Sequence, residues 1–202
     1  MAQNQRSRRA LLVCACVAFL SGEGARDIAD AEPLNIVALG ASNTSGWGVG
    51  SQSAYPALLE AMLKAKGYDA RVINQGQSFD TTGGMLRRVD AAVPDSTSVV
   101  ILNPGGNDLR FFGSKKQRGE NISEMVSRLR ARHIEVIVFE NSIVPPNLYQ
   151  WDGIHFNAEG HNVVASYLLP RVIAATIPQP KMPLPLSAAP RNKYGFGAHS
   201  TQ

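Results

Sequence analysis

Cysteine is almost absent from this chain of 202 residues, and its scarcity excludes several kinds of site. Cys14 and Cys16 are the only two, and both lie in an apolar run near the start of the sequence. We expect that run to be a secretory signal that is removed, which would leave a chain without cysteine. A disulfide and a Cys-ligated metal site are then excluded, and the fold must depend on its hydrophobic core.

The chain also lacks a strong excess of charge of either sign. Its 20 Lys and Arg residues against 16 Asp and Glu residues give a formal net charge of +4, and the basic residues are scattered. A nucleic-acid-binding protein would show a basic stripe interleaved with aromatic side chains, so we expect no nucleic-acid partner. The densest basic group, residues 115–118, is interpreted as a solvated loop.

No hydrophobic run is long enough to cross a membrane. Residues 10–20 are apolar and follow three arginines, but they supply only about half of the ~20 residues that a spanning helix needs. This pattern is typical of a secretory signal peptide, with lipid attachment to a cysteine as the weaker alternative. Residues 29–31 (Ala-Asp-Ala) fit the cleavage rule, and Ala25 is a second candidate.

These features predict three segments. Residues 1–31 would be the signal peptide, residues 32–177 the folded domain, and residues 178–202 a disordered tail. The last segment is rich in proline and polar residues and has no periodicity, so it could not offset the entropy cost of ordering. The protein would be secreted or periplasmic, without stable insertion into a membrane.

The body alternates short β-branched runs with helical patterns. The pattern predicts strands over residues 35–39, 71–73, 98–102 and 135–139, and helices over 55–66, 85–93, around 122–129 and over 157–175. Asn121 or Ser123 would cap the third helix. Alternation of this kind indicates an α/β fold with a parallel sheet and helices on both faces, whose sites form at the carboxyl ends of the strands.

Ser42 follows the first predicted strand, where a serine can act as a nucleophile at a strand-to-helix turn. Taken alone, it is more often a simple helix cap. A phosphate-binding loop is a poor alternative, since the required Gly-Lys-Ser/Thr is missing. After the third strand, Asn107 follows two glycines and could donate a hydrogen bond to an oxyanion, although Gly-Gly-Asn-Asp is also a good turn.

Asp152 precedes His155 by three residues, with a glycine between them, just before the last helix. Such an aspartate can accept a hydrogen bond from the imidazole and leave the other ring nitrogen to take a proton from a serine. A metal site formed by Asp152, His155 and His161 is the alternative. No helical His-x-x-x-His pair supports it, and His161 would be a structural or surface residue of the final helix.

In this order, these residues closely resemble the four sequence blocks of the SGNH (GDSL-type) hydrolase family, named for Ser, Gly, Asn and His. The resemblance covers residues 36 to about 169. The first block is residues 37–44, in which Gly40-Ala41-Ser42 stands where the family usually has Gly-Asp-Ser. The third is Gly106-Asn107-Asp108, and the last is Asp152-Gly153-Ile154-His155 followed by Asn157-Ala158-Glu159-Gly160-His161.

The sequence departs from the family pattern at three points. Ala41 replaces an aspartate that supports the loop in the family. In the second block, residues 74–82, Phe79 stands where the oxyanion-hole glycine is usual, with Gly76 as the nearby alternative. Only 43 residues separate Asp108 from Asp152. We therefore expect a three-layer α/β/α, flavodoxin-like fold with about four strands in the order 2-1-3-4 and a shallow site.

The resemblance implies a serine esterase in which Ser42 forms an acyl-enzyme, His155 moves the proton and Asp152 orients the imidazole. The oxyanion would be bound by Asn107, by the Ser42 N–H and by the N–H of Phe79 or Gly76. No cofactor is implied. Small acyl or acetyl esters, including O-acetylated glycans, are the expected substrates, bound by Trp47, Phe111 and Trp151. The alternative is a degenerate SGNH fold that binds glycans without turnover.

Overall fold

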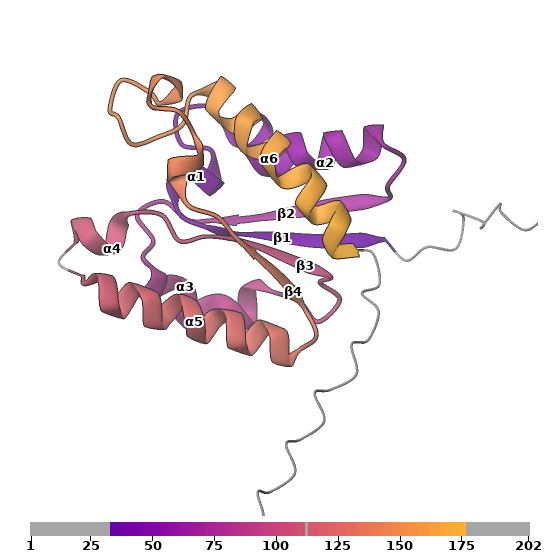
Figure 1. Ribbon diagram of the computed structural model, residues 1–202, viewed down its shortest axis with the longest axis horizontal. Helices are drawn as coiled ribbons and strands as arrows, with labels where there is room; N and C mark the ends of the chain where they lie inside the picture. Colours follow the sequence, from indigo (N-terminus) through magenta and orange to yellow (C-terminus); the bar gives the residue numbers. More distant parts are fainter. Residues whose placement is uncertain (1–32, 112, 177–202) are drawn as a thin grey trace, which may run out of the picture. The chain divides into compact units, whose positions relative to one another are not determined.

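The computed structural model describes residues 33–111 and 113–176. Four parallel strands form its sheet in the order β2-β1-β3-β4 (Figure 1). Strand β1 (Leu34–Gly40) pairs with β2 (Ala70–Gly76) on one side and with β3 (Val99–Asn103) on the other, and β4 (Glu135–Val138) pairs with β3. The expected number and order of strands are therefore confirmed. The expected signal peptide and tail, residues 1–31 and 178–202, lie outside the described residues.

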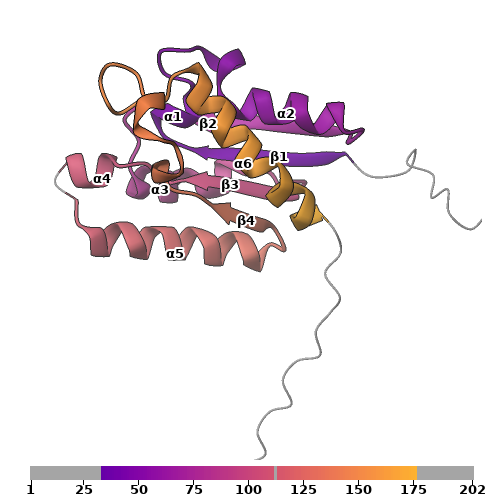
Figure 2. The ribbon, with the colours of Figure 1, turned by 45° about the horizontal axis from the view of Figure 1, so that its top comes forward.

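Helices cover both faces of the sheet, as the three-layer prediction requires (Figure 2). One face carries α2 (Tyr55–Ala65) and α6 (Ala158–Thr176), and the other carries α3 (Thr82–Ala92) and α5 (Lys115–Ala131). Short helices occupy the connecting segments: α1 (Ser42–Ser45), α4 (Asn107–Arg110), and the 3-10 turns η2 (Ser51–Ser53), η3 (Asn141–Ile143) and η4 (Pro146–Leu148). None of the helices formed by the described residues is long and apolar enough to cross a bilayer.

The two central strands have apolar residues on both sides because both sides are covered by helices. In β1, Ile36 and Ala38 belong to the core beneath α2 and α6, whereas Val37 and Leu39 belong to the core beneath α3 and α5. All four are fully buried. The continuous apolar run of this strand is therefore a direct consequence of its place in the middle of three layers.

Two helix starts differ from the sequence prediction, each because of a capping residue. Helix α3 begins at Thr82 instead of Met85, since the Thr81 hydroxyl accepts a hydrogen bond from the Gly84 N–H (3.2 Å). Helix α5 begins at Lys115, since the Ser114 hydroxyl accepts from the Gln117 N–H (3.0 Å).

Consequently residues 115–118 form the first turn of α5, and the expectation of a loop there is wrong. The two expected caps, Asn121 and Ser123, lie inside the helix. Asn121 is buried, and its Nδ2 donates to Thr82 Oγ1 (3.0 Å). Its polar side chain thus links α5 to α3.

Strand β4 lies at the edge of the sheet, and Val138 is 39% exposed. After β4 the chain passes through η3 and η4 and reaches Trp151 without forming another strand within the described residues. The short spacing between Asp108 and Asp152 is the reason, because it leaves no length for a further strand and its crossover helix.

Candidate active site

Ser42 lies where β1 ends at the carboxyl edge of the sheet, as the first residue of α1. The turn between them is tight: a Cβ on Gly40 would overlap the Thr44 side chain, and one on Gly76 would overlap the backbone of Ser45. These two glycines let α1 pack closely against β1 and β2. The side chain of Ser42 is thereby presented at the sheet edge, partly buried, with its N–H at a helix start where no preceding turn can accept it.

Ser42, His155 and Asp152 form a continuous chain of hydrogen bonds. His155 Nε2 lies 2.9 Å from Ser42 Oγ, and His155 Nδ1 lies 2.6 Å from Asp152 Oδ2. The side chains of His155 and Asp152 are 15% and 18% exposed, so water reaches the pair only in part. The arrangement leaves Nε2 as the ring nitrogen that faces the serine hydroxyl, which is the geometry of a general base beside its nucleophile.

Asp152 is held in its ionised form by the loop that it precedes. Its Oδ1 accepts hydrogen bonds from the backbone N–H of His155 (3.0 Å) and of Ile154 (2.9 Å), which Gly153 permits with φ of 65°. The His155 backbone bond is the largest cause that lowers the pKa of Asp152 to about 2, and the imidazole bond adds to it. An ionised Asp152 accepts the Nδ1–H of His155 and so fixes the tautomer.

Asn43, the residue after the serine, fixes the segment that carries the histidine. Its Nδ2 donates to the carbonyl oxygen of Ile154 (3.2 Å), and its Oδ1 accepts from the Phe156 N–H (2.9 Å). One side chain therefore binds both neighbours of His155. Sequence reasoning missed this role, although a polar residue that is 4% exposed beside a nucleophile needs partners.

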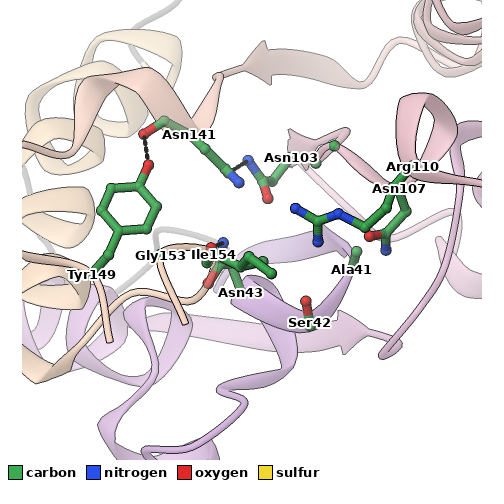
Figure 3. A pocket seen from close by; sticks show the side chains of 12 residues that line it. Ala41, Ser42, Asn43, Asn103, Asn107, Arg110, Asn141, Tyr149, Gly153 and Ile154 are labelled. Carbon is green, nitrogen blue, oxygen red and sulfur yellow. Dashed lines mark hydrogen bonds between the residues drawn. The ribbon is translucent and has the colours of Figure 1, made fainter. Parts of the chain in front are cut away.

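The amide of Asn107 faces the same pocket as Ser42 (Figure 3). Asn107 begins α4 and is 8% exposed, and its Nδ2 donates to the carbonyl oxygen of Asp80 (2.8 Å). An amide nitrogen carries two hydrogens, so this bond orients the group and leaves the second hydrogen for a ligand.

The two candidates for the second-block donor differ in their backbone. The Gly76 N–H already donates to Asn74 Oδ1 (2.9 Å), and the residue is needed for the close approach of α1. Phe79 has φ of 66°, the left-handed conformation that glycine adopts readily and other residues adopt at a cost. The position thus requires a glycine-like backbone, and Phe79 supplies it. This leaves Phe79 as the residue that we expect to donate.

The Phe79 side chain is 66% exposed and lies edge-on against Trp47, with ring centroids 5.7 Å apart. Trp47 in turn stacks on the His155 ring at 5.6 Å with an interplanar angle of 27°. The two aromatic rings form a ledge beside the base. Phe111 and Trp151, which were also expected to bind substrate, are 46% and 97% exposed and are not among the residues that line the pocket.

The pocket beside Ser42 has a volume of about 210 Å³ and a mainly polar lining. Besides Ser42 and Asn107, its polar side chains come from Asn43, Asn103, Arg110, Asn141 and Tyr149. Figure 3 shows the Arg110 guanidinium turned into it. Asn103 ends β3, and Asn141 begins η3 in the segment that follows β4, so the rule that sites form at carboxyl ends of strands could have indicated them.

The three side chains of the metal alternative do not come together. His161 is buried between aromatic rings, 5.6 Å from Phe156 and 6.4 Å from Tyr55 between centroids, and its Nδ1 accepts from the Tyr55 N–H (3.2 Å). Burial lowers the pKa of His161 to about 4. It is thus a neutral core residue, while Asp152 and His155 bind each other.

Comparison with known proteins gives consistent matches. Residues 38–151 match the model of the GDSL-like lipase/acylhydrolase family. The chain is 31% identical to the esterase TesA of Pseudomonas aeruginosa over 69% of its own length and 67% of that protein. It is 33% identical to an arylesterase of Vibrio mimicus over 55% of its own length, and it spans 56% of that relative.

The fold also matches solved structures. The psychrotrophic esterase EstA from Pseudoalteromonas sp. superposes with a TM-score of 0.60 at 19% identity, over 69% of this chain and 97% of EstA. At that identity the match bears on the fold alone, and it agrees with the three layers described above.

Proposed function

The chain belongs to the GDSL-like lipase/acylhydrolase family and is a serine hydrolase that acts on ester bonds, and from this premise we propose that it cleaves small esters through an acyl-enzyme on Ser42. The single observation that carries the proposal is the chain of hydrogen bonds from Ser42 Oγ through His155 to Asp152. It joins a nucleophile, a base and the group that orients the base.

In the first step Ser42 Oγ attacks the carbonyl carbon of the ester while His155 Nε2 takes the hydroxyl proton. The tetrahedral intermediate collapses as the C–O bond to the alcohol breaks, and His155 returns the proton to the leaving oxygen. Water then attacks the acyl-enzyme by the same route, giving the carboxylic acid and free Ser42. Asp152 stays ionised throughout and stabilises the imidazolium.

The negative charge on the former carbonyl oxygen would be stabilised by donors that are already in place. These are the second hydrogen of Asn107 Nδ2, the N–H of Ser42 at the start of α1, and the N–H of Phe79. Donors fixed before the reaction require little reorganisation when the charge develops, and each contributes about 10²–10³ in turnover.

The shape of the pocket supports small and polar substrates. A volume of about 210 Å³ with a polar lining suits an acetyl or other short acyl group, or a sugar hydroxyl bearing one, better than a long alkyl chain. The Trp47–Phe79 ledge beside His155 offers a face for the aryl or sugar ring of the leaving alcohol. With a signal peptide at residues 1–31, these substrates would be met outside the cytoplasm, as in O-acetylated glycans.

The test uses the purified protein with a fluorophosphonate probe and p-nitrophenyl acetate. Wild type should become labelled and turn over, whereas Ser42→Ala should lose both and His155→Ala should lose turnover by at least about 10⁴-fold. Ser53→Ala, which changes an exposed serine, is the matched control and should behave as wild type. Equal background in all variants would overturn the proposal and would favour a glycan-binding module.

Substrate size is tested with the same variants. p-Nitrophenyl acetate should be cleaved with a higher kcat/KM than p-nitrophenyl octanoate, and acetylated xylan should release acetate in a Ser42-dependent manner. Preference for the octanoate ester would contradict the proposed substrate class while leaving the mechanism intact.

A further inference from the structure

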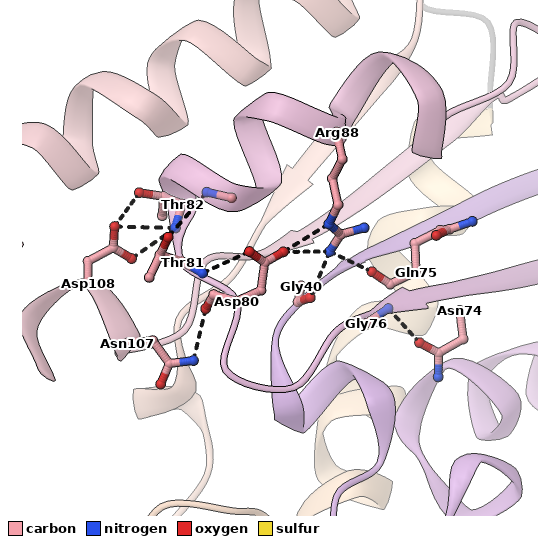
Figure 4. A network of polar contacts seen from close by, with 11 residues as sticks. Gly40, Asn74, Gln75, Gly76, Asp80, Thr81, Thr82, Arg88, Asn107 and Asp108 are labelled. Carbon is pink, nitrogen blue, oxygen red and sulfur yellow. Dashed lines mark hydrogen bonds and ion pairs between the residues drawn. The ribbon is translucent and has the colours of Figure 1, made fainter. Parts of the chain in front are cut away.

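Arg88 lies in α3 and extends its guanidinium toward Gly40 at the end of β1 (Figure 4). Its Nε donates to Asp80 Oδ2 (2.9 Å), and its Nη2 lies 2.8 Å from the same oxygen. Nη2 also donates to the carbonyl oxygens of Gly40 (3.2 Å) and Gln75 (2.9 Å). The Arg88 and Asp80 side chains are only 17% and 10% exposed, so this ion pair is weakly screened by solvent.

The three partners of Arg88 lie in two of the three segments that would supply the oxyanion donors, and one of them, Asp80, also contacts the third segment. Gly40 ends β1 two residues before Ser42, and Gln75 lies near the end of β2. Asp80 follows Phe79 directly, and its carbonyl oxygen is the acceptor that orients the Asn107 amide. One guanidinium thus contacts the segments of Ser42 and Phe79 directly and the Asn107 amide through Asp80.

We propose that Arg88 is the positioning residue of the oxyanion hole, acting through Asp80 and Gly40 on Asn107 and Ser42. The inference rests on the proposed function, since it needs an oxyanion to be formed at Ser42.

The role requires the planar fork of arginine. Arg88 meets one carboxylate and two carbonyl oxygens with two adjacent nitrogens, whereas the single ammonium of a lysine cannot reach this set of acceptors in the same geometry. Loss of the fork would let the Asp80 loop and the Ser42 loop shift relative to each other. Such a shift weakens contacts made to the transition state more than contacts made to bound ester, so it lowers kcat more than it raises KM.

The first experiment compares Arg88→Met, Arg88→Lys and the control Arg87→Met. Arg87 is the exposed neighbour on the same helix. On p-nitrophenyl acetate we expect kcat of Arg88→Met to fall about 100-fold, as for loss of one oxyanion donor, with KM changed less than about threefold. Arg88→Lys should fall between Arg88→Met and wild type, and Arg87→Met should match wild type.

A double-mutant cycle separates positioning from a general structural role. If Arg88 acts through the amide of Asn107, Arg88→Met should cost much less in an Asn107→Ala background than in wild type. The inference would be overturned if the reductions in kcat caused by Arg88→Met and Asn107→Ala simply multiply in the double variant. It would also be overturned if kcat of Arg88→Met stays within about threefold of wild type. If Arg88→Met does not fold, Arg88→Lys and Asp80→Asn carry the same cycle.

Failure of this inference can be distinguished from failure of the proposed function. Retained turnover in Ser42→Ala would reject the acyl-enzyme mechanism itself. Turnover that depends on Ser42 but is insensitive to Arg88 would reject the positioning role alone.

Discussion

The two faces of the sheet contribute different kinds of groups to the candidate site. On the side of α2 and α6, Asp152 and His155 reach Ser42 through direct contacts between side chains, at 2.6 and 2.9 Å. On the side of α3 and α5, the proposed oxyanion donors are backbone groups and one amide, which contact Asp80 and, through it, Arg88. Proton transfer would therefore depend on a few named side chains, whereas oxyanion binding would depend on the placement of whole segments.

The supports of the two halves differ in the same way. Beneath the histidine segment, Tyr55, Phe156 and His161 form a buried aromatic cluster. Beneath the oxyanion segment lies a polar network, in which the Asp108 carboxylate accepts from Thr82 Oγ1 (2.6 Å) and Asn121 binds that same hydroxyl. Changes on the first side should thus act through proton transfer and core packing, and changes on the second through geometry.

The largest expected effect comes from a substitution that disrupts proton transfer. Asp152→Asn should lower kcat on p-nitrophenyl acetate by about 10⁴-fold, because an amide cannot fix the His155 tautomer as the carboxylate does. Asp69→Asn, at an exposed aspartate, should leave kcat unchanged. A loss below about tenfold in Asp152→Asn would mean that His155 is oriented by other groups.

The next largest effect is expected from a substitution that removes a proposed oxyanion donor. Asn107→Ala should lower kcat by about 10²–10³-fold with little change in KM, because its amide acts on the charge that develops in the transition state. Asn162→Ala, on the exposed face of α6, is the matched control. A rise in KM at constant kcat would instead assign Asn107 to ground-state binding.

The residues proposed for proton transfer are easier to recognise in the sequence than those proposed for the oxyanion hole. Asp152 and His155 stand three residues apart, so their pairing is a local pattern that the chain order reveals. Arg88 contacts two backbone carbonyls, which have no signature in the sequence, and it lies 48 residues from Gly40. Its role could not be predicted without knowing how the ends of β1 and β2 meet.

In the fold, too, some features were predictable from the sequence and others were not. The central strands were predictable because burial on both faces makes them continuously apolar, and the order 2-1-3-4 followed from the family pattern and the short spacing before Asp152. The starts of α3 and α5 were not placed correctly. Apolar periodicity marks the middle of a helix, whereas Thr81 and Ser114 determine its first turn. The positive φ of Phe79 could be anticipated only from the glycine expected there.

Acid should weaken the aromatic support beneath the histidine segment. The pKa of His161 is lowered from 6.5 to about 4, so the stability that it contributes is complete above pH 6.5 and is lost as pH falls toward 4. Urea unfolding should therefore show a loss of roughly 2–3 kcal/mol between pH 7 and pH 4.5 from this group. The stability that Asp152 contributes is complete above pH 3.8 and is lost only as pH falls toward 2, outside this window.

His161→Gln tests the assignment, since it removes the titrating group from the aromatic cluster. The variant should show a flatter dependence of the unfolding free energy on pH over the same range. An unchanged dependence would place the acid-sensitive group elsewhere.

The smallest expected effect sharpens the geometry of the oxyanion side. Phe79→Gly and Phe79→Val both lose the contact with Trp47, but only glycine adopts φ of 66° without steric cost. Phe79→Val should unfold more easily than Phe79→Gly by about 1–2 kcal/mol. Phe79→Gly should keep kcat within about threefold, because the N–H is retained. Equal stability of the two variants would show that the loop relaxes.

The double contact of Asn43 with the carbonyl of Ile154 and the N–H of Phe156 ties the Ser42 loop directly to the segment that carries His155. Gln150 adds a second link, because its Nε2 donates to the carbonyl oxygens of Trp47 (2.8 Å) and Phe156 (2.9 Å). A segment inserted between β4 and Gln150 should therefore leave the 2.9 Å contact between Ser42 and His155 in place, as long as both links are kept.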